Sequence, residues 1–388
     1  MTSNSSQPSY AAFSREEMER RYARARELMA RRGIDALFIT NEENFQYFAG
    51  TTGTLALHYS NTRPAIFILP LEGDPIILSG KIITQSLEVS CHVKDLRGYT
   101  NIIDFPHELA LEALRDAGLK NGRVGAELGQ EQRLGMPVGD YLRLVEALPQ
   151  VQFVDAAETV IRLRMVKSPE EVAYMKQAAD ITGRARQRMF DQVAPGMTER
   201  DVVRLLRRLI LEEGGDRTSF VHLITDLPAA HSQHHLDRPL KKGNSLYVDA
   251  GAYVRSYTID YPRIATLGKA SEEHKRMHRT LLEINAMMAD AMRPGVKCSE
   301  LYRLGARAIE EAGYEMVPSG RIGHGQGLLL TEPPSISADD DTELEPGMVV
   351  STEPEITMTF YWEDVHVITG EGHQQLTLET DELREIPF

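Results

Sequence analysis

The sequence contains little cysteine, no long apolar segment and no excess of positive charge. Only two cysteines, Cys91 and Cys298, occur among 388 residues, so we expect no disulfide framework and a reducing, cytoplasmic location. No apolar run approaches the ~20 residues of a membrane-spanning helix, and residues 1–13 are polar and serine-rich, unlike a signal peptide. Lys and Arg number 43 against 57 Asp and Glu, a net charge of −14, which argues against nucleic acid or anionic membranes as partners.

The remaining composition is that of a globular protein with two domains. Hydrophobic residues make up 42% of the chain and charged residues 26%, enough apolar mass for a large core. Predicted strands alternate with helices up to about residue 160, which indicates an α/β N-terminal domain over residues 1–160. Residues 161–388 combine helices with a strand-rich remainder and form the second predicted domain.

Helix starts are the clearest local signals. Ser14 begins a Ser-x-x-Glu capping box, and the helix that follows is expected to end at Gly33. Ser168 begins a second box with proline at the first helical position, and Thr198 begins a third helix that ends near Gly214. Further predicted helices cover residues 107–117, 271–292 and 298–312, and predicted strands cover residues 35–40, 65–69, 75–78 and 123–126.

Four acidic residues and one histidine in the second domain lie in apolar or glycine-rich sequence, where charged and polar side chains are uncommon. They are Asp249, Asp260, His324, Glu353 and Glu363. Asp249 is expected to end a strand, Gly251 to permit a turn, and Asp260 to face Asp249 from the returning strand. Taken alone, each has an ordinary alternative, since an aspartate that ends a strand is usually a turn residue and a histidine between glycines is equally often a surface residue.

Taken together, these five side chains predict a metal site. A carboxylate buried in a strand is costly unless it is paired or bound to a cation. Two aspartates, one histidine and two glutamates form an oxygen-rich ligand set that suits Mn²⁺, Co²⁺, Fe²⁺ or Zn²⁺ in a bridged pair. Two such ions can activate a water molecule and polarise a carbonyl group at the same time.

The order and spacing of these residues resembles the pita-bread metallopeptidase family, in the branch of aminopeptidase P, prolidase and creatinase. The shared pattern is an Asp, a second Asp eleven residues later, His-x-x-Gly-Leu, Gly-Met-Val-x-x-x-Glu-Pro and Glu-Asp-x-x-x-x-Thr. Arg164-x-x-Lys167-Ser168-Pro169 is similar to the start of that catalytic domain, and residues 33–37, 44–47 and 62–64 are similar to the N-terminal domain of the branch. The resemblance therefore covers nearly the whole chain.

The resemblance implies a fold, a pair of metals and a reaction. It implies a creatinase-like α/β N-terminal domain and an α+β pita-bread catalytic domain that binds two divalent ions, Mn²⁺ first. Asp249 would bind one metal, Asp260 and Glu363 would bridge both, and His324 and Glu353 would complete the shell. A hydroxide between the metals would attack a scissile amide, with Glu353 as general base, in an Xaa-Pro dipeptidase or aminopeptidase. Relatives with this layout also imply a homodimer.

The chain departs from this pattern at the histidines with which proline-specific relatives bind and protonate substrate. Thr331 stands seven residues after the metal-binding histidine, where such relatives have another histidine, and Gly320 stands at a second such position. A third position lies beside His231. We therefore expect His231 or Glu332 to supply the proton donor.

Two other functions remain open at this point. A non-peptidase of the same fold would act on a small molecule, as creatinase, ectoine hydrolase and dimethylsulfoniopropionate lyase do, and residues 320–332 look somewhat like the lyase branch. A catalytically silent binding protein is the third possibility, and the complete ligand set argues against it.

Overall fold

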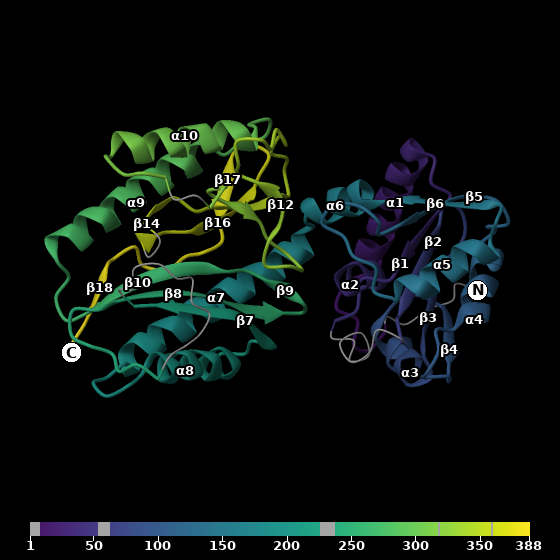
Figure 1. Ribbon diagram of the computed structural model, residues 1–388, viewed down its shortest axis with the longest axis horizontal. Helices are drawn as coiled ribbons and strands as arrows, with labels where there is room; N and C mark the ends of the chain where they lie inside the picture. The colour runs from purple at the N-terminus through teal and green to yellow at the C-terminus, as the bar shows by residue number, and fades with distance from the viewer. Residues whose placement is uncertain (1–7, 53–62, 226–236, 317–318, 358–359) are drawn as a thin grey trace. The chain divides into compact units, whose positions relative to one another are not determined.

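A computed structural model describes residues 8–52, 63–225, 237–316, 319–357 and 360–388. The chain divides into two compact units, Met1–Arg164 and Met165–Phe388 (Figure 1). None of the described helices is both long and apolar enough to cross a membrane.

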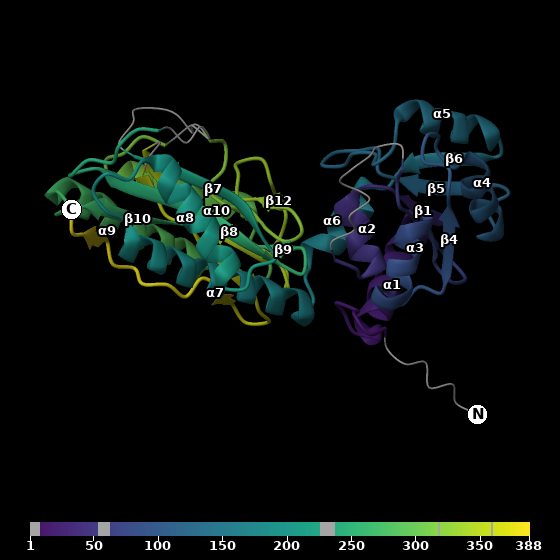
Figure 2. The ribbon, with the colours of Figure 1, turned by 90° about the horizontal axis from the view of Figure 1, so that it is seen from below.

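The first unit is built on a six-stranded mixed sheet with the order β4-β3-β2-β1-β5-β6. Its strands are β1 (Ala36–Ile39), β2 (Ile66–Pro70), β3 (Ile76–Gly80), β4 (Asp95–Tyr99), β5 (Gly122–Ala126) and β6 (Val151–Asp155). Its helices are α1 (Arg15–Arg32), α2 (Glu42–Ala49), α3 (Lys81–Ser90), α4 (His107–Asp116), α5 (Val138–Ala147) and α6 (Ala157–Met165). The helices lie around the sheet, as expected for an α/β domain (Figures 1 and 2).

Local signals specify where these elements begin and end. The side chain of Ser14 accepts a hydrogen bond from Glu17 N, and α1 ends at Gly33 with a left-handed φ of 62°. The predicted strands and the two predicted helices of this unit are all present, with boundaries within one or two residues. Helices α2, α3, α5 and α6 and strands β4 and β6 have short or irregular patterns and were not predicted.

The second unit contains two five-stranded sheets. The first has the order β18-β10-β8-β7, with β9 paired to β8, and the second has the order β12-β11-β13-β16-β17. The strands of the first sheet are β7 (Arg217–Ile224), β8 (Ser245–Val254), β9 (Tyr257–Thr258), β10 (Tyr261–Leu267) and β18 (Arg384–Ile386). Those of the second are β11 (His324–Gly325), β12 (Glu332–Ser335), β13 (Val349–Thr352), β16 (Asp364–Ile368) and β17 (His373–Gln375), and β14 (Glu355–Thr357) pairs with β15 (Phe360–Tyr361) alone.

Four helices cover these sheets: α7 (Pro169–Gln192), α8 (Glu199–Glu212), α9 (Glu272–Ala291) and α10 (Cys298–Glu311). Helices α7 and α8 pack on β8 and β7, whereas α9 packs on β13, β14 and β15 and against α10 (Figures 1 and 2). The capping box at the start of α7 is complete, because Glu171 N donates to Ser168 Oγ and Ser168 N donates to Glu171 Oε2. All four helices were predicted from the sequence.

The prediction for the first hairpin of this unit was wrong in its boundaries. Asp249 does not end a strand, because β8 continues for ten buried residues from Ser245 to Val254. Gly251 is not a turn residue either. A Cβ atom there would lie 2.2 Å from the carbonyl oxygen of Ile259, so the glycine permits β8 and the segment around Ile259 to approach each other closely. The turn occurs at Arg255 and Ser256, whose φ angles of 50° and 68° are typical of a tight hairpin.

Candidate metal centre

The two aspartates come from adjacent segments of the first sheet, Asp249 from β8 and Asp260 from the two residues that connect β9 with β10. Asp249 lies in the middle of β8, paired with His222 of β7 on one side and Pro262 of β10 on the other. Asp260 precedes Pro262 by two residues, so both carboxylates point to the same face of the sheet, as diagonal rather than opposite neighbours. Each has a buried Oδ1 atom that accepts no hydrogen bond from the described residues.

His324 is fixed in position by the close approach of three backbone segments. A Cβ at Gly323 would lie 2.2 Å from Ser351 O, and one at Gly325 would lie 2.5 Å from Pro333 O, so only glycine fits on either side. The His324 Nδ1 atom lies 3.0 Å from the carbonyl oxygen of Gly325. A carbonyl can only accept, so Nδ1 carries the proton and Nε2 keeps its lone pair for a metal ion.

The two glutamates approach the free nitrogen of this histidine. His324 Nε2 lies 3.8 Å from Glu363 Oε1 and 3.9 Å from Glu353 Oε2. The Glu353 side chain is 23% exposed and that of Glu363 only 1%, so Glu353 lies on the open side of the group. The Oε2 atom of Glu363 is buried and accepts no hydrogen bond from the described residues.

The acidic residue next to Glu363 shows what a purely structural carboxylate looks like here. Asp364 accepts hydrogen bonds of 2.7–2.8 Å from four buried side chains, those of Arg263, Asn285, Trp362 and Thr377. These four donors satisfy both of its oxygens. Because Asp364 is anchored in this way, the chain direction of β16 is fixed and Glu363 is directed to the opposite side.

Three of the five predicted ligands form one close group, Glu353 Oε2 lies 3.9 Å from His324 Nε2, and Asp249 is the diagonal strand neighbour of Asp260. Asp260, His324 and Glu363 each offer one ligand atom, and these atoms all lie within 4.8 Å of one another. Burial, followed by the charges of Asp249 and Glu353, raises the pKa of Asp260 well above its usual range. Burial, followed by Glu353 and Asp260, does the same to the pKa of Glu363.

The two outer carboxylates are shifted in the same direction. Burial raises the pKa of Asp249 to about 7, against an opposing effect of Arg186, and burial together with Asp249 raises the pKa of Glu353 to about 8. Burial, and after it Arg321, lowers the pKa of His324 to about 3, so its ring is neutral at pH 7. A neutral imidazole among four carboxylates that repel one another fits divalent cations, which supply the missing positive charge.

Sequence reasoning missed Gln326, whose amide joins two of the candidate ligands. Its Nε2 donates to Glu363 Oε1 at 2.9 Å and to the backbone oxygen of Asp260 at 3.1 Å, and its Oε1 accepts from Asp260 N at 3.0 Å. Gln326 is fully buried. The available signal was an amide side chain between two glycines in an otherwise apolar stretch.

The predicted proton donors have different surroundings. Glu332 is 4% exposed, accepts from Leu329 N at 2.9 Å and lies 3.4 Å from Lys167 Nζ. A Cβ at Gly327 would lie 2.9 Å from Glu332 Oε2, so the segment after His324 packs directly on this carboxylate. His231 lies outside the described residues.

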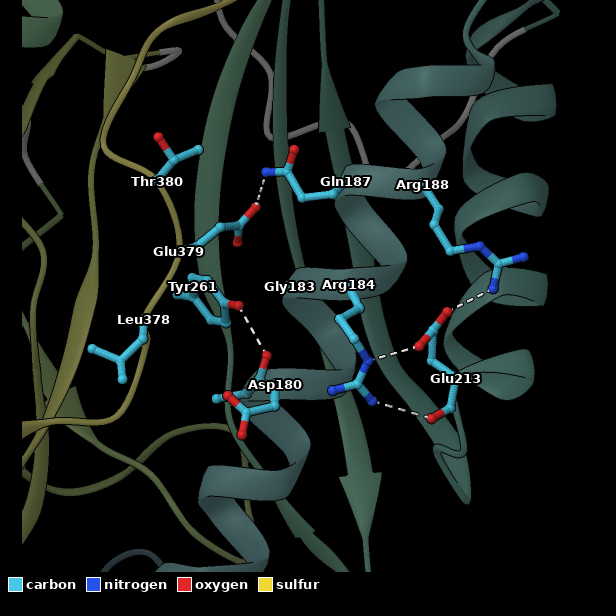
Figure 3. Close-up of a pocket in the computed structure, with 11 residues that line it drawn as sticks. Asp180, Gly183, Arg184, Gln187, Arg188, Glu213, Tyr261, Leu378, Glu379 and Thr380 are labelled. Carbon is cyan, nitrogen blue, oxygen red and sulfur yellow. Dashed lines mark hydrogen bonds and ion pairs between the residues drawn. The ribbon is translucent and has the colours of Figure 1, made fainter.

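A surface pocket elsewhere in this unit contrasts with the metal centre, because its charged groups already have partners (Figure 3). It lies between α7 and the segment around Leu378. Arg184 and Arg188 pair with Glu213, and Gln187 donates to Glu379. Behind it, the buried guanidinium of Arg186 forms an ion pair with Glu379 at 2.5 Å. This arrangement fixes α7 to the C-terminal segment, and none of the described carboxylates that line the pocket is a buried, unsatisfied one like those of the metal centre.

Both units of the chain match known protein families. Residues 173–374 match the model of metallopeptidase family M24, and residues 21–166 match that of the creatinase/prolidase N-terminal domain. The uncharacterized peptidase YqhT of Bacillus subtilis (strain 168) is 28% identical over 364 residues, which is 92% of this chain and 98% of that protein. The Xaa-Pro dipeptidase of Pyrococcus furiosus is 25% identical over 373 residues, covering 94% of this chain and 100% of that protein.

A solved structure gives the same result. The crystal structure of dipeptidase PepE from Mycobacterium ulcerans superposes with a TM-score of 0.80 at 26% identity, and the match covers 97% of this chain and 100% of that one. The predicted fold class, a creatinase-like N-terminal domain followed by a pita-bread catalytic domain, is therefore confirmed. With more than half of its length matched, and with all five candidate ligands inside the matched segment, the chain belongs to metallopeptidase family M24.

Proposed function

We propose that this protein is a metal-dependent Xaa-Pro dipeptidase. The observation that carries the proposal is the buried group of carboxylates around a neutral His324, in a chain of family M24. Two relatives that match almost its full length, from Pyrococcus furiosus and Pyrococcus horikoshii, are named Xaa-Pro dipeptidases. The non-peptidase alternative has no comparable support among these relatives.

The proposed ligands are the five residues predicted from the sequence. Asp249 would bind one ion, Asp260 and Glu363 would bridge two, and His324 and Glu353 would complete the coordination. The orphaned oxygens of Asp249, Asp260 and Glu363 support this assignment, because buried carboxylate oxygens without donors need cations. Oxygen ligands with a single nitrogen favour Mn²⁺ as the first candidate, with Co²⁺, Fe²⁺ and Zn²⁺ as alternatives.

The other steps of catalysis are assigned to side chains around the metal centre. When bound, the two ions would supply Lewis-acid activation of the scissile carbonyl and would acidify a water molecule. Glu353, on the open side of the group, would accept the proton of the attacking water. His231 and Glu332 remain the proposed donors to the departing proline nitrogen. Gln326 would keep Glu363 and Asp260 at a fixed separation throughout.

The proposal includes a small peptide substrate, a homodimer and a cytoplasmic location. The dipeptidase names of the relatives support a short substrate. The homodimer rests on analogy with relatives of the same two-domain layout alone. Cys91 and Cys298 are buried free thiols, in keeping with a reducing compartment.

The test combines metal analysis with turnover. We expect the protein reconstituted with Mn²⁺ to bind two ions per chain and to hydrolyse Ala-Pro and Gly-Pro faster than longer Xaa-Pro peptides. Asp260→Asn should lose both metal and activity. Two bound ions without hydrolysis of any Xaa-Pro peptide would refute the peptidase assignment, and full metal content in Asp260→Asn would refute the ligand assignment.

A further inference from the structure

Arg263, in β10, is a buried arginine that joins the two sheets of the catalytic unit. Its side chain is only 4% exposed. The Nη1 atom donates to the backbone oxygen of Pro262 at 2.8 Å and to the backbone oxygen of Glu363 at 2.9 Å, and Nη2 donates to Asp364 Oδ1 at 2.7 Å. Arg263 belongs to the first sheet, whereas Glu363 directly precedes β16 of the second. These hydrogen bonds therefore connect the two sheets at a candidate ligand.

The guanidinium of Arg263 also contacts the chain neighbours of both proposed bridging ligands. Its Cζ atom lies 4.8 Å from the centre of the Tyr261 ring and 4.0 Å from the centre of the Trp362 ring. Tyr261 directly follows Asp260, and Trp362 directly precedes Glu363. Attraction between a guanidinium and an aromatic face is strongest where water is excluded, as it is at this buried position. One planar group thus holds the residue next to each bridging carboxylate.

These contacts exceed what the charge of Asp364 requires. Asp364 accepts hydrogen bonds from three other buried side chains besides Arg263. A lysine at position 263 would still supply the positive charge, but an ammonium group has neither the plane that stacks on the two rings nor the fixed fork that reaches Glu363 O and Asp364 at once. The particular contribution of the arginine is therefore to the geometry of the two ligand segments.

The separation of the two bridging carboxylates decides whether two ions fit between them. The ions of such a pair lie about 3.5–4 Å apart, and each bridging carboxylate has to reach both. Asp260 and Glu363 offer ligand atoms within 4.8 Å of each other, but they come from different sheets, so any shift between the sheets changes this separation. The first ion can draw the ligands towards itself, whereas the second has to accept the positions that remain.

We propose that Arg263 is a positioning residue that sets the separation of Asp260 and Glu363 and thereby determines the affinity of the protein for the second metal ion. In this role Arg263 contacts neither metal nor substrate and acts through Tyr261, Trp362 and the backbone of Glu363. The inference rests on the proposed function, because it takes these two carboxylates as the bridging ligands.

Metal titration of Arg263→Lys tests the proposal, because lysine keeps the charge and loses the planar fork. By calorimetry, the affinity for the second Mn²⁺ should fall about 10- to 100-fold, the usual effect of removing a group that orients a ligand. In electron paramagnetic resonance, wild type should show a spin-coupled Mn²⁺ pair, and the variant at the same Mn²⁺ concentration should show uncoupled ions. The kcat for Ala-Pro should fall at low Mn²⁺ and recover at high Mn²⁺, which a purely structural defect would not do.

Arg21→Lys is the matched control, because Arg21 has the same surroundings in the unit that holds none of the proposed ligands. The Arg21 side chain is buried, its Cζ lies 4.0 Å and 4.4 Å from the centres of two aromatic rings, and its Nε pairs with Glu17 at 2.7 Å. This variant should bind Mn²⁺ as wild type does. Melting temperatures report whether each variant is folded. If Arg263→Lys is not, Trp362→Leu removes one ring, leaves the donors of Arg263 in place and should weaken the same ion.

The outcomes separate this inference from the proposed function. If wild type binds two ions and hydrolyses Ala-Pro, but Arg263→Lys binds the second ion as tightly as wild type, the inference is wrong while the proposed function stands. An equal loss of the second ion in Arg21→Lys would also refute the inference, because the loss would then reflect reduced stability. If wild type binds two ions but hydrolyses no Xaa-Pro peptide, the peptidase assignment fails and the metal titrations still decide the role of Arg263. If wild type binds fewer than two ions, the two-ion assignment and the inference fail together.

Discussion

Removal of the divalent ions should lower the melting temperature of the catalytic unit, and the loss should be larger at pH 8 than at pH 5.5. In the metal-free protein the pKa of Asp249 is about 7, against an ordinary 3.8, and that of Glu353 is about 8, against 4.5. The folded state therefore binds more protons than the unfolded chain between about pH 4 and pH 8. The contribution of these two carboxyl groups to the stability of the metal-free protein is fully present on the acidic side of this window. It is lost as the pH rises through the window.

The size of the effect follows from linkage. An ion present at about 100 times its dissociation constant stabilises the folded state by about 2.7 kcal/mol for one site. For a unit of about 220 residues, Met165–Phe388, each kcal/mol corresponds to about 2–4 °C. One occupied site should therefore raise the melting temperature by about 5–11 °C at pH 8. At pH 5.5 the carboxyl groups hold protons that a metal has to displace, so the difference should be smaller.

Differential scanning calorimetry with Mn²⁺ or with a chelator at both pH values measures this difference. Asp260→Asn serves as the control, since a variant without the proposed bridging carboxylate should show little response to metal at pH 8. A metal-dependent shift that is larger at pH 5.5 than at pH 8, or no shift at either pH, would refute the reasoning from these carboxylates.

Three further changes test other parts of the catalytic unit. Gln326→Leu removes the amide that holds Glu363, and Mn²⁺ affinity measured by calorimetry should fall about 10- to 100-fold; unchanged affinity would show that Gln326 does not position a ligand. Glu379→Gln leaves the buried guanidinium of Arg186 without its counter-charge and should destabilise the unit by about 3–5 kcal/mol in urea unfolding. A loss under ~1 kcal/mol would show that this buried ion pair contributes no more to the stability of the unit than an exposed pair does. Glu332→Gln should reduce kcat about 10²- to 10⁴-fold if Glu332 donates the proton, and retained kcat would exclude that role.

Local sequence signals were sufficient for the helix boundaries. Ser14, Ser168 and Thr198 cap helices whose first-turn backbone N–H groups need acceptors, and the structure contains all three bonds. These contacts span three residues and are independent of the remainder of the chain. The turn after β8 was misplaced because an aspartate and a glycine in sequence do not reveal that strands will pair with them on both sides.

The types of the candidate ligands were also evident from the sequence, but their surroundings were not. Four carboxylates and a histidine in apolar context predicted a metal centre, because such groups are too costly to bury without cations. Nothing in the local pattern distinguishes Glu363 from Asp364, its neighbour in the chain. Their roles differ because four donors from distant segments converge on Asp364 and none of the described residues donates to Glu363 Oε2.

The sequence by itself determined the family, the helices of the second unit and the five candidate ligands, because capping, hydrophobic pattern and motif spacing are local properties of the chain. Only the tertiary structure decided that His324 presents Nε2 to the centre, that Gln326 connects Asp260 with Glu363, and that Arg263 reaches the backbone of Glu363. These contacts depend on which strands become neighbours, and the pairing of strands is set by packing over the whole unit rather than by any one segment.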